Sequence, residues 1–209
     1  MASAIIHLAI AKEVLKKVKV KRQYDFYLGS IAPDLSKQIG YSKYESHFLK
    51  NSSKQNIPNI DLFVTKYHDF KHNSFDLGYF THLYTDKLWF DKFLSSKNFN
   101  NFIKLLDGTI INTTQNEIVS LIYSDYTNLN IDLIDEYNLD LSLFYEEFQK
   151  PKTNINEIPV DRLDILINKM GIIIENSKQN NKQYIFDIQE IKLFIKETTE
   201  AILKELEKY

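Results

Sequence analysis

The scarcity of helix-breaking residues constrains the fold of this sequence more than any other feature. Five glycines and four prolines occur in 209 residues, whereas folds with many strands need frequent turns, which these residues favour. Apolar residues recur at helical spacing, as in the stripe Ile191, Ile195, Ile202 and Leu206 near the end of the chain. The sequence therefore predicts an all-α fold, a multi-helix bundle in one domain over residues 1–209.

Capping and proline signals place the expected helices. Ser3 is a suitable N-cap for a first helix that runs to about Val18. A second, short helix passes through Gly29 and should stop near Pro33, because proline disfavours helix in the residue before it. Further helices are expected at residues 59–70, 74–94, 97–107, 113–123, 131–149, 159–178 and 186–208. The polar composition of residues 51–59 predicts an exposed loop. Residues 150–158 are expected to form a longer surface loop. The expected helices beyond residue 95 should form the outer part of the bundle.

Composition excludes several functional classes. The formal net charge of -2 gives no basic surface for nucleic-acid binding. The absence of cysteine excludes disulfides and thiolate metal sites, so any metal ligands must be His, Asp, Glu or backbone atoms. No stretch approaches the roughly 18 uninterrupted apolar residues of a membrane span. We expect a cytoplasmic protein without a transmembrane segment.

The histidines indicate where metal chemistry would lie. All five occur within the first 82 residues, and His82 is followed four residues later by Asp86, which puts both side chains on one face of a helix. His7, Asp34 and His47 also adjoin apolar segments rather than charged runs. Imidazole and carboxylate ligands without thiolate suit zinc, manganese or iron. A structural histidine or an interhelical hydrogen bond would explain each residue taken alone.

Taken together, these residues lie in strings that resemble the N-terminal motifs of the zinc-dependent phospholipase C family, which is related to the single-strand-specific zinc nucleases. The resemblance covers roughly the first 90 residues. The matching strings are Ile-Ile-His-Leu-Ala-Ile-Ala at His7, Leu-Gly-Ser-Ile-Ala-Pro-Asp at Asp34, Ser-His-Phe at His47, and Gly-Tyr-Phe-Thr-His-Leu-Tyr-Thr-Asp-Lys-Leu-Trp at His82 and Asp86.

The resemblance implies a metal site. It implies that Asp34, His47, His82 and Asp86 surround one metal, and that Asp86 bridges to a second metal, which His7 also binds. In the secreted relatives the free N-terminus helps to hold that second metal, and here His7 is close enough to the start of the sequence for the amino terminus to reach it. The relatives bind a further metal through later histidines, but none follows His82. We therefore expect one or two zinc ions, with manganese or iron as alternatives.

The activity that the resemblance implies is hydrolysis of a phosphoric ester by a metal-activated water, with Asp34 orienting or deprotonating that water. The expected substrate is a small-molecule or lipid phosphoester, such as a phospholipid or a nucleotide. Lys87, Tyr41 and Tyr84 are candidates for neutralising the phosphate, although each is also typical of an ordinary surface residue.

Two other readings of the sequence remain open. The dipeptide His68-Asp69 invites comparison with the helical HD-type metal phosphohydrolases, although it also fits a polar helix end followed by a loop. In a non-enzymatic alternative, the protein would be a metal-binding or partner-binding module, and Tyr79, Phe80 and Trp89 would line a pocket instead of forming core. Loss of metal binding on Asp69→Ala would favour the first reading, whereas loss on Asp86→Ala would favour the phospholipase-like site.

Overall fold

A computed structural model describes residues 1–49, 56–97, 99, 102–175, 177 and 185–209 of the chain. The prediction of an all-α fold is confirmed, since helices dominate these residues and a small antiparallel hairpin provides the strands described. The elements are α1 (Ala4–Leu15), α2 (Gln23–Ile31), the 3-10 turn η1 (Ala32–Asp34), α3 (Leu35–Gln38), α4 (Lys43–Ser46), α5 (Ile60–Lys66), η2 (Phe70–His72), α6 (Ser74–Leu88), the π-helical turn η3 (Trp89–Leu94), β1 (Phe102–Lys104), β2 (Ile110–Asn112), α7 (Gln115–Glu136), η4 (Ser142–Phe144), η5 (Val160–Arg162), α8 (Leu163–Glu175) and α9 (Ile188–Leu206).

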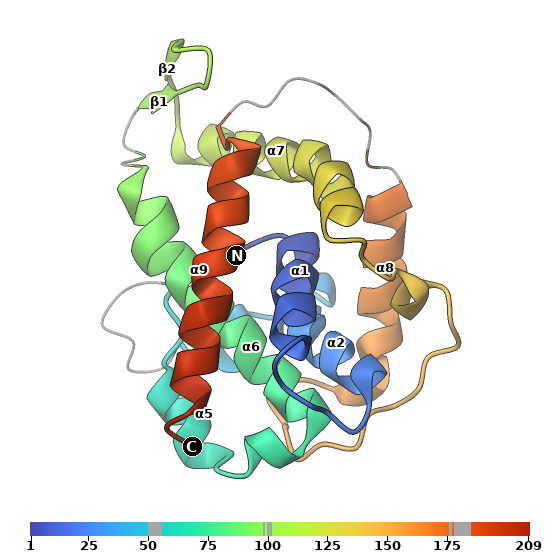
Figure 1. Ribbon diagram of the computed structural model, residues 1–209. Coiled ribbons are helices and arrows are strands. Elements are labelled where there is room, and N and C mark those ends of the chain that lie inside the picture. Colours follow the sequence, from blue (N-terminus) through green and yellow to red (C-terminus); the bar gives the residue numbers. More distant parts are fainter. Residues whose placement is uncertain (50–55, 98, 100–101, 176, 178–184) are drawn as a thin grey trace.

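Helix α6 lies in the interior of the bundle. The Asn73 side chain caps its first turn by accepting hydrogen bonds from the backbone of Phe75 and Asp76. Every side chain from Phe75 to Asp86 is buried. Helices α1, α2, α5 and α9 all contact α6, and they surround it in Figure 1. A helix buried on all sides has no solvated face, so its polar residues must find partners inside the protein.

Two glycines bring α2 and α6 into near backbone contact. A Cβ atom at Gly29 would lie 2.1 Å from the Phe75 carbonyl oxygen, and one at Gly78 would lie 2.1 Å from the Phe26 carbonyl oxygen. Neither distance is sterically allowed, so any side chain at these positions would push the two helices apart. The close crossing places the end of α2 beside the middle of α6.

Helices from the two ends of the chain share one side of the core. Helix α1 begins as predicted, with the Ser3 hydroxyl accepting a hydrogen bond from the Ile6 amide at 3.2 Å, but it ends at Leu15 rather than Val18. Helix α9 packs against both α1 and α6. The predicted apolar stripe of α9, from Ile191 to Leu206, is buried. That residues 1–209 form one domain stays a prediction.

Two predicted helices are wrong. The segment predicted as a helix at 97–107 includes β1, which pairs with β2 across a turn at Gly108, where φ is +86°. The side chain of Asp107 accepts a hydrogen bond from the Thr109 amide at 2.9 Å, and this Asp-Gly turn favours a hairpin over a helix. The helix predicted at 131–149 ends at Glu136, two residues before Asn138 adopts a left-handed conformation. Helix α7 instead continues unbroken from Gln115.

The segment 150–158 has no regular secondary structure, as predicted, but it is not a simple surface loop. Ile155 and Ile158 are each only 4% exposed. Thr153 donates a hydrogen bond to Asp76 of α6, and the Glu157 carboxylate accepts one from Tyr67 at 2.6 Å. The segment therefore packs along α5 and the start of α6. Most of the loop predicted at 51–59 lies outside the described residues.

No helix within the described ranges is long and apolar enough to cross a membrane.

Candidate metal centre

The structure brings together all five candidate ligands from four places in the chain. His7 lies in the first turn of α1, Asp34 ends η1, His47 follows α4, and His82 and Asp86 lie one turn apart in α6. None of the five side chains is more than 5% exposed. Residues separated by up to 79 positions in the sequence thus meet in one buried polar cluster.

The Nε2 atoms of His47 and His82 each lie near carboxylate oxygens of Asp34 and Asp86. The Nε2 atom of His47 lies 3.3 Å from Nε2 of His82, 3.5 Å from Oδ1 of Asp34 and 3.6 Å from Oδ2 of Asp86. The His82 Nε2 atom lies 4.0 Å from the same Asp34 oxygen and 3.8 Å from the same Asp86 oxygen. Ligands about 2.0–2.1 Å from a tetrahedral zinc ion are roughly 3.3–3.5 Å apart. The spacing of the His47, His82 and Asp86 atoms therefore fits such an ion, and Oδ1 of Asp34 lies close to both rings.

The two oxygens of Asp86 face different partners. Oδ2 faces His47 and His82, whereas Oδ1 lies 3.5 Å from Nε2 of His7 and accepts a hydrogen bond from the Ala2 amide at 3.0 Å. The His7 ring stacks on the His82 ring, with the centroids 3.9 Å apart. His7, Asp34 and His82 also form a compact ligand group of their own. The cluster is thus large enough to offer ligands on both sides of Asp86.

Neighbouring oxygens orient two of the imidazole rings. The Nδ1 atom of His82 lies 2.9 Å from the Ser30 carbonyl oxygen, which can only accept a hydrogen bond, so Nδ1 carries the proton and Nε2 is left with a lone pair. The Nδ1 atom of His47 lies 2.9 Å from the Ser46 hydroxyl. Tyr79 of α6 donates a 2.6 Å hydrogen bond to the Ser46 carbonyl oxygen and so anchors the end of α4. Ser30 reaches His82 because Gly29 and Gly78 let α2 and α6 approach closely.

Several atoms of the cluster are buried without a hydrogen-bond partner. They are both ring nitrogens of His7, Oδ1 of Asp34 and Oδ2 of Asp86. A buried polar atom left unpaired costs about 1–3 kcal/mol, and more when it is charged. A cation bound among these atoms would remove that cost. The residues present therefore fit a metal ion.

The charge states also suit a divalent cation. Burial, together with the adjacent His7, lowers the pKa of His82 to about 3, so this ring is neutral at physiological pH. Burial acts to raise the pKa of the Asp86 carboxyl, but the amino-terminal charge and the His7 ring hold it well below its usual range. The pKa of Asp34 is likewise lowered, because the His47 and His82 rings outweigh its burial. Ionised carboxylates beside a neutral imidazole form a typical donor set for zinc.

A family model described as zinc-dependent phospholipase C matches residues 6–113, more than half of the chain. The chain belongs to the zinc-dependent phospholipase C family. All five buried residues of the cluster fall inside the matched segment, and the resemblance seen in the sequence is confirmed. No curated protein and no solved structure matches the chain.

The alternative His-Asp pair, His68 and Asp69, lies in a very different environment from the five buried candidate ligands. The side chains of His68 and Asp69 are 80% and 79% exposed, and they form a 3.1 Å contact with each other. In the part of the chain that the structure describes, neither belongs to a group of three or more potential ligands. Tyr79, Phe80 and Trp89 are fully buried and belong to the hydrophobic core of the described residues.

Two cavities that share lining residues lie near the cluster, and Asp34 borders one of them. One, of about 210 Å³, is lined by Asp34 and by apolar side chains of α8 that include Met170, Ile173 and Ile174. The other, of about 220 Å³, is lined by Met1, Lys37, Tyr41, Lys43 and Tyr123. Met1, Lys37 and Tyr123 line both. Sequence reasoning missed Lys37 and Lys43, since neither occurs in a family-like string.

The candidate phosphate-neutralising residues separate in the structure. Tyr41 lines the cavity beside the cluster. Tyr84 instead donates a hydrogen bond to Glu205 of α9 at 3.2 Å, and the Lys87 ammonium lies 5.2 Å from the Tyr84 ring centroid.

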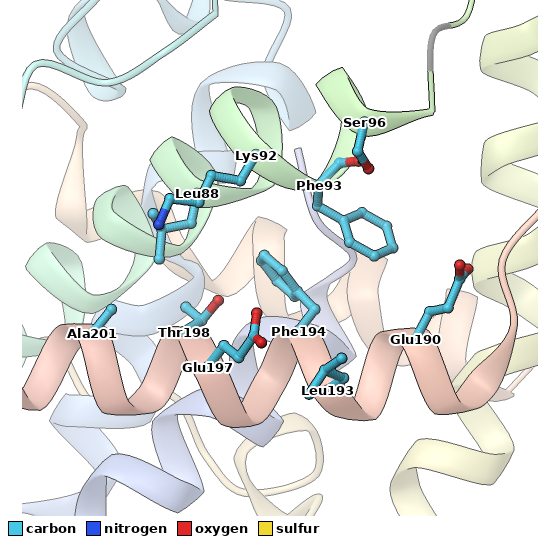
Figure 2. A pocket seen from close by; sticks show the side chains of 10 residues that line it. All are labelled: Leu88, Lys92, Phe93, Ser96, Glu190, Leu193, Phe194, Glu197, Thr198 and Ala201. Carbon is cyan, nitrogen blue, oxygen red and sulfur yellow. The ribbon is translucent and has the colours of Figure 1, made fainter.

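A further groove of about 280 Å³ runs between η3 and α9, where Phe93 and Phe194 face each other (Figure 2). None of the five candidate ligands lines that groove.

Proposed function

We propose that this protein is a metal-dependent hydrolase of phosphoric esters and that His7, Asp34, His47, His82 and Asp86 hold one or two divalent ions. Zinc is the first choice, with manganese or iron as alternatives. The observation that carries the proposal is that the Nε2 atoms of His47 and His82 lie 3.3 Å from each other and 3.5–4.0 Å from carboxylate oxygens of Asp34 and Asp86, and that several atoms of the cluster are buried without partners.

The proposed division of ligands follows the two oxygens of Asp86. His47, His82, Asp34 and Oδ2 of Asp86 form one site, and His7 with Oδ1 of Asp86 faces a second. When bound, such an ion polarises a phosphoryl oxygen and lowers the pKa of a water molecule. The protein supplies fixed ligand positions, with Ser30 and Ser46 holding the rings of His82 and His47 in place.

Asp34 is the candidate for orienting or deprotonating the attacking water. It is the one member of the five that lines the 210 Å³ cavity, so its carboxylate meets molecules that enter there. A carboxylate held ionised by neighbouring rings can accept a proton from a water within hydrogen-bond reach.

A phospholipid is the substrate that the family name suggests, and the cavity has features that suit an amphiphilic ester. The side chains of Met170, Ile173 and Ile174 line the same cavity as Asp34 and make part of its wall apolar. An ester with an apolar group against this wall would present its phosphoryl group to Asp34. A smaller phosphodiester or phosphomonoester would use the same polar end.

Metal content measured on the intact protein and on His82→Ala, together with assays on phosphodiesters and phosphomonoesters, tests this function. We expect at least one equivalent of metal in the wild type, its loss in the variant, and activity that follows metal content. Less than one metal per chain after native purification would contradict the proposal. A fully loaded but inert protein would instead favour a metal-binding or partner-binding module.

A further inference from the structure

We propose that Lys37 and Lys43 form a phosphate-binding subsite beside the metal centre, so that the substrate presents an anionic phosphate group to this wall rather than a quaternary ammonium group. This inference rests on the proposed function, because it concerns the substrate of the same site. It is carried by a cavity, two lysines without acidic partners, and two tyrosines.

The position of the cavity links these lysines to the cluster. Lys37 and Lys43 line the 220 Å³ cavity, and Lys37 also lines the 210 Å³ cavity that Asp34 borders. Both lysines belong to the short helices, α3 and α4, that lie between Asp34 and His47 in the sequence. A group bound between them would therefore lie next to the proposed ligands.

Lys43 is a cation with an incomplete environment. Its side chain is half-buried, and its ammonium lies 5.1 Å from the ring centroid of Phe90. Burial lowers the pKa of Lys43, while the carboxylates of Asp86 and Asp34 act to raise it. Over the described ranges of the chain, Lys43 has no ion pair with any carboxylate. A partly desolvated ammonium that makes no direct ion pair favours an anionic ligand.

Lys37 is held in place by an aromatic neighbour. Its ammonium donates a hydrogen bond to the Tyr123 hydroxyl and lies 4.4 Å from the centroid of that ring. It likewise makes no ion pair with an acidic side chain among the residues described. The contact with Tyr123 reduces the freedom of a long side chain, so less entropy is lost when an anion binds.

The chemistry of the lining favours phosphate over choline-like groups. The five residues that line this cavity, Met1, Lys37, Tyr41, Lys43 and Tyr123, include two ammonium groups and two phenolic hydroxyls but no carboxylate. Ammonium and hydroxyl donors can bind the oxygens of a phosphate group. A quaternary ammonium group would be repelled by both lysines and would find no acidic partner here.

Titration calorimetry of the intact, natively purified protein with inorganic phosphate tests the subsite, using Lys37→Gln and Lys43→Gln. We expect each substitution to weaken phosphate binding on the order of tenfold, because each removes one charged donor. Lys43→Arg should retain most of the affinity. Lys104→Gln is the matched control, since it removes the same charge from an exposed position of β1, and it should bind phosphate like the wild type. Metal content should be the same in all variants.

The inference is overturned if the wild type does not bind phosphate, or if both glutamine variants bind it as tightly as the wild type. Its failure is distinguishable from failure of the proposed function. If both glutamine variants bind phosphate as tightly as the wild type and metal content is unchanged, only the subsite is contradicted. Phosphate binding that depends on the lysines in a protein without metal contradicts the proposed function and supports the subsite. Choline chloride serves as the second probe, and tight choline binding that the lysine variants leave unchanged would also overturn the inference.

Discussion

The protein contains two His-Asp pairs whose environments are opposite. His82 and Asp86 are completely buried in α6 and lie among other potential ligands, whereas His68 and Asp69 are about four-fifths exposed in a turn after α5. In water the exposed pair gains little from its contact, because solvent screens both groups. Inside the protein the buried pair needs a partner of positive charge. The same two residue types thus suggest different functions because of their surroundings.

The largest expected difference between the pairs is in metal content. Asp86→Ala should remove most of the bound metal and lower phosphoesterase activity by roughly a thousandfold or more, because it deletes the proposed bridging ligand. Elemental analysis of the purified proteins and steady-state assays measure both effects. Asp69→Ala is the matched control and should leave both at the wild-type values. Metal loss in the control variant instead would support the HD-type reading.

The close contact between α2 and α6 explains why the His82 pair is buried, and a substitution at Gly78 tests it. Gly78→Ala places a Cβ atom 2.1 Å from the Phe26 carbonyl oxygen and should destabilise the fold by about 3 kcal/mol or more. Gly171→Ala is the control. Its Cβ would lie 3.6 Å from the nearest atom, in ordinary contact, and it should be neutral or stabilise α8 by about 1 kcal/mol or less. Urea unfolding measures both, and equal midpoints for the two variants would contradict the proposed close packing.

The buried pair should also give the metal-free protein a pH dependence that the exposed pair does not. The pKa of His82 is lowered by burial and by the adjacent His7, from an ordinary 6.5 to about 3. A ring that is harder to protonate in the folded state stabilises the fold fully above pH 6.5, and this contribution is lost as the pH falls from about 6.5 towards 3.

Urea midpoints of the chelator-treated protein over this pH range measure the effect. His82→Gln should flatten the profile between pH 6.5 and 4, whereas His68→Gln should retain the wild-type profile. If the urea midpoint of His82→Gln depends on pH as steeply as that of the wild type, the acid sensitivity arises from other groups.

The smallest expected effect concerns the support of His47. Ser46→Ala removes the hydroxyl 2.9 Å from Nδ1 of His47 and should weaken metal affinity on the order of tenfold, since such outer partners orient the ligand ring. Competition with a chromophoric chelator measures the affinity. Ser96→Ala, which removes an exposed hydroxyl two residues after η3, is the control and should bind metal like the wild type. Equal affinities in the two variants would argue against a role for Ser46.

Local signals in the sequence predicted much of the fold. The cap at Ser3, the proline stop near Pro33 and the stripe of α9 each depend on residues close together in the chain, and these features are found in the structure. The helices predicted at 97–107 and 131–149 failed although the features that ended them are local as well. Apolar spacing favoured a helix at both, but the Asp107-Gly108 turn and the left-handed Asn138 interrupted the pattern.

The sequence by itself determined the all-α class from composition and apolar spacing, and it suggested the five candidate ligands through residue type, apolar neighbours and resemblance to the family motifs. It favoured an exposed turn for His68 and Asp69, but only the tertiary structure decided how deeply each His-Asp pair is buried, because Gly29 and Gly78 let α2 pack closely on α6. Nor could the sequence show that Lys37 and Lys43 line one cavity, because that cavity also includes Tyr123 of α7. Only the tertiary structure brings together groups so distant in the chain, and it does so by packing apolar surface around them.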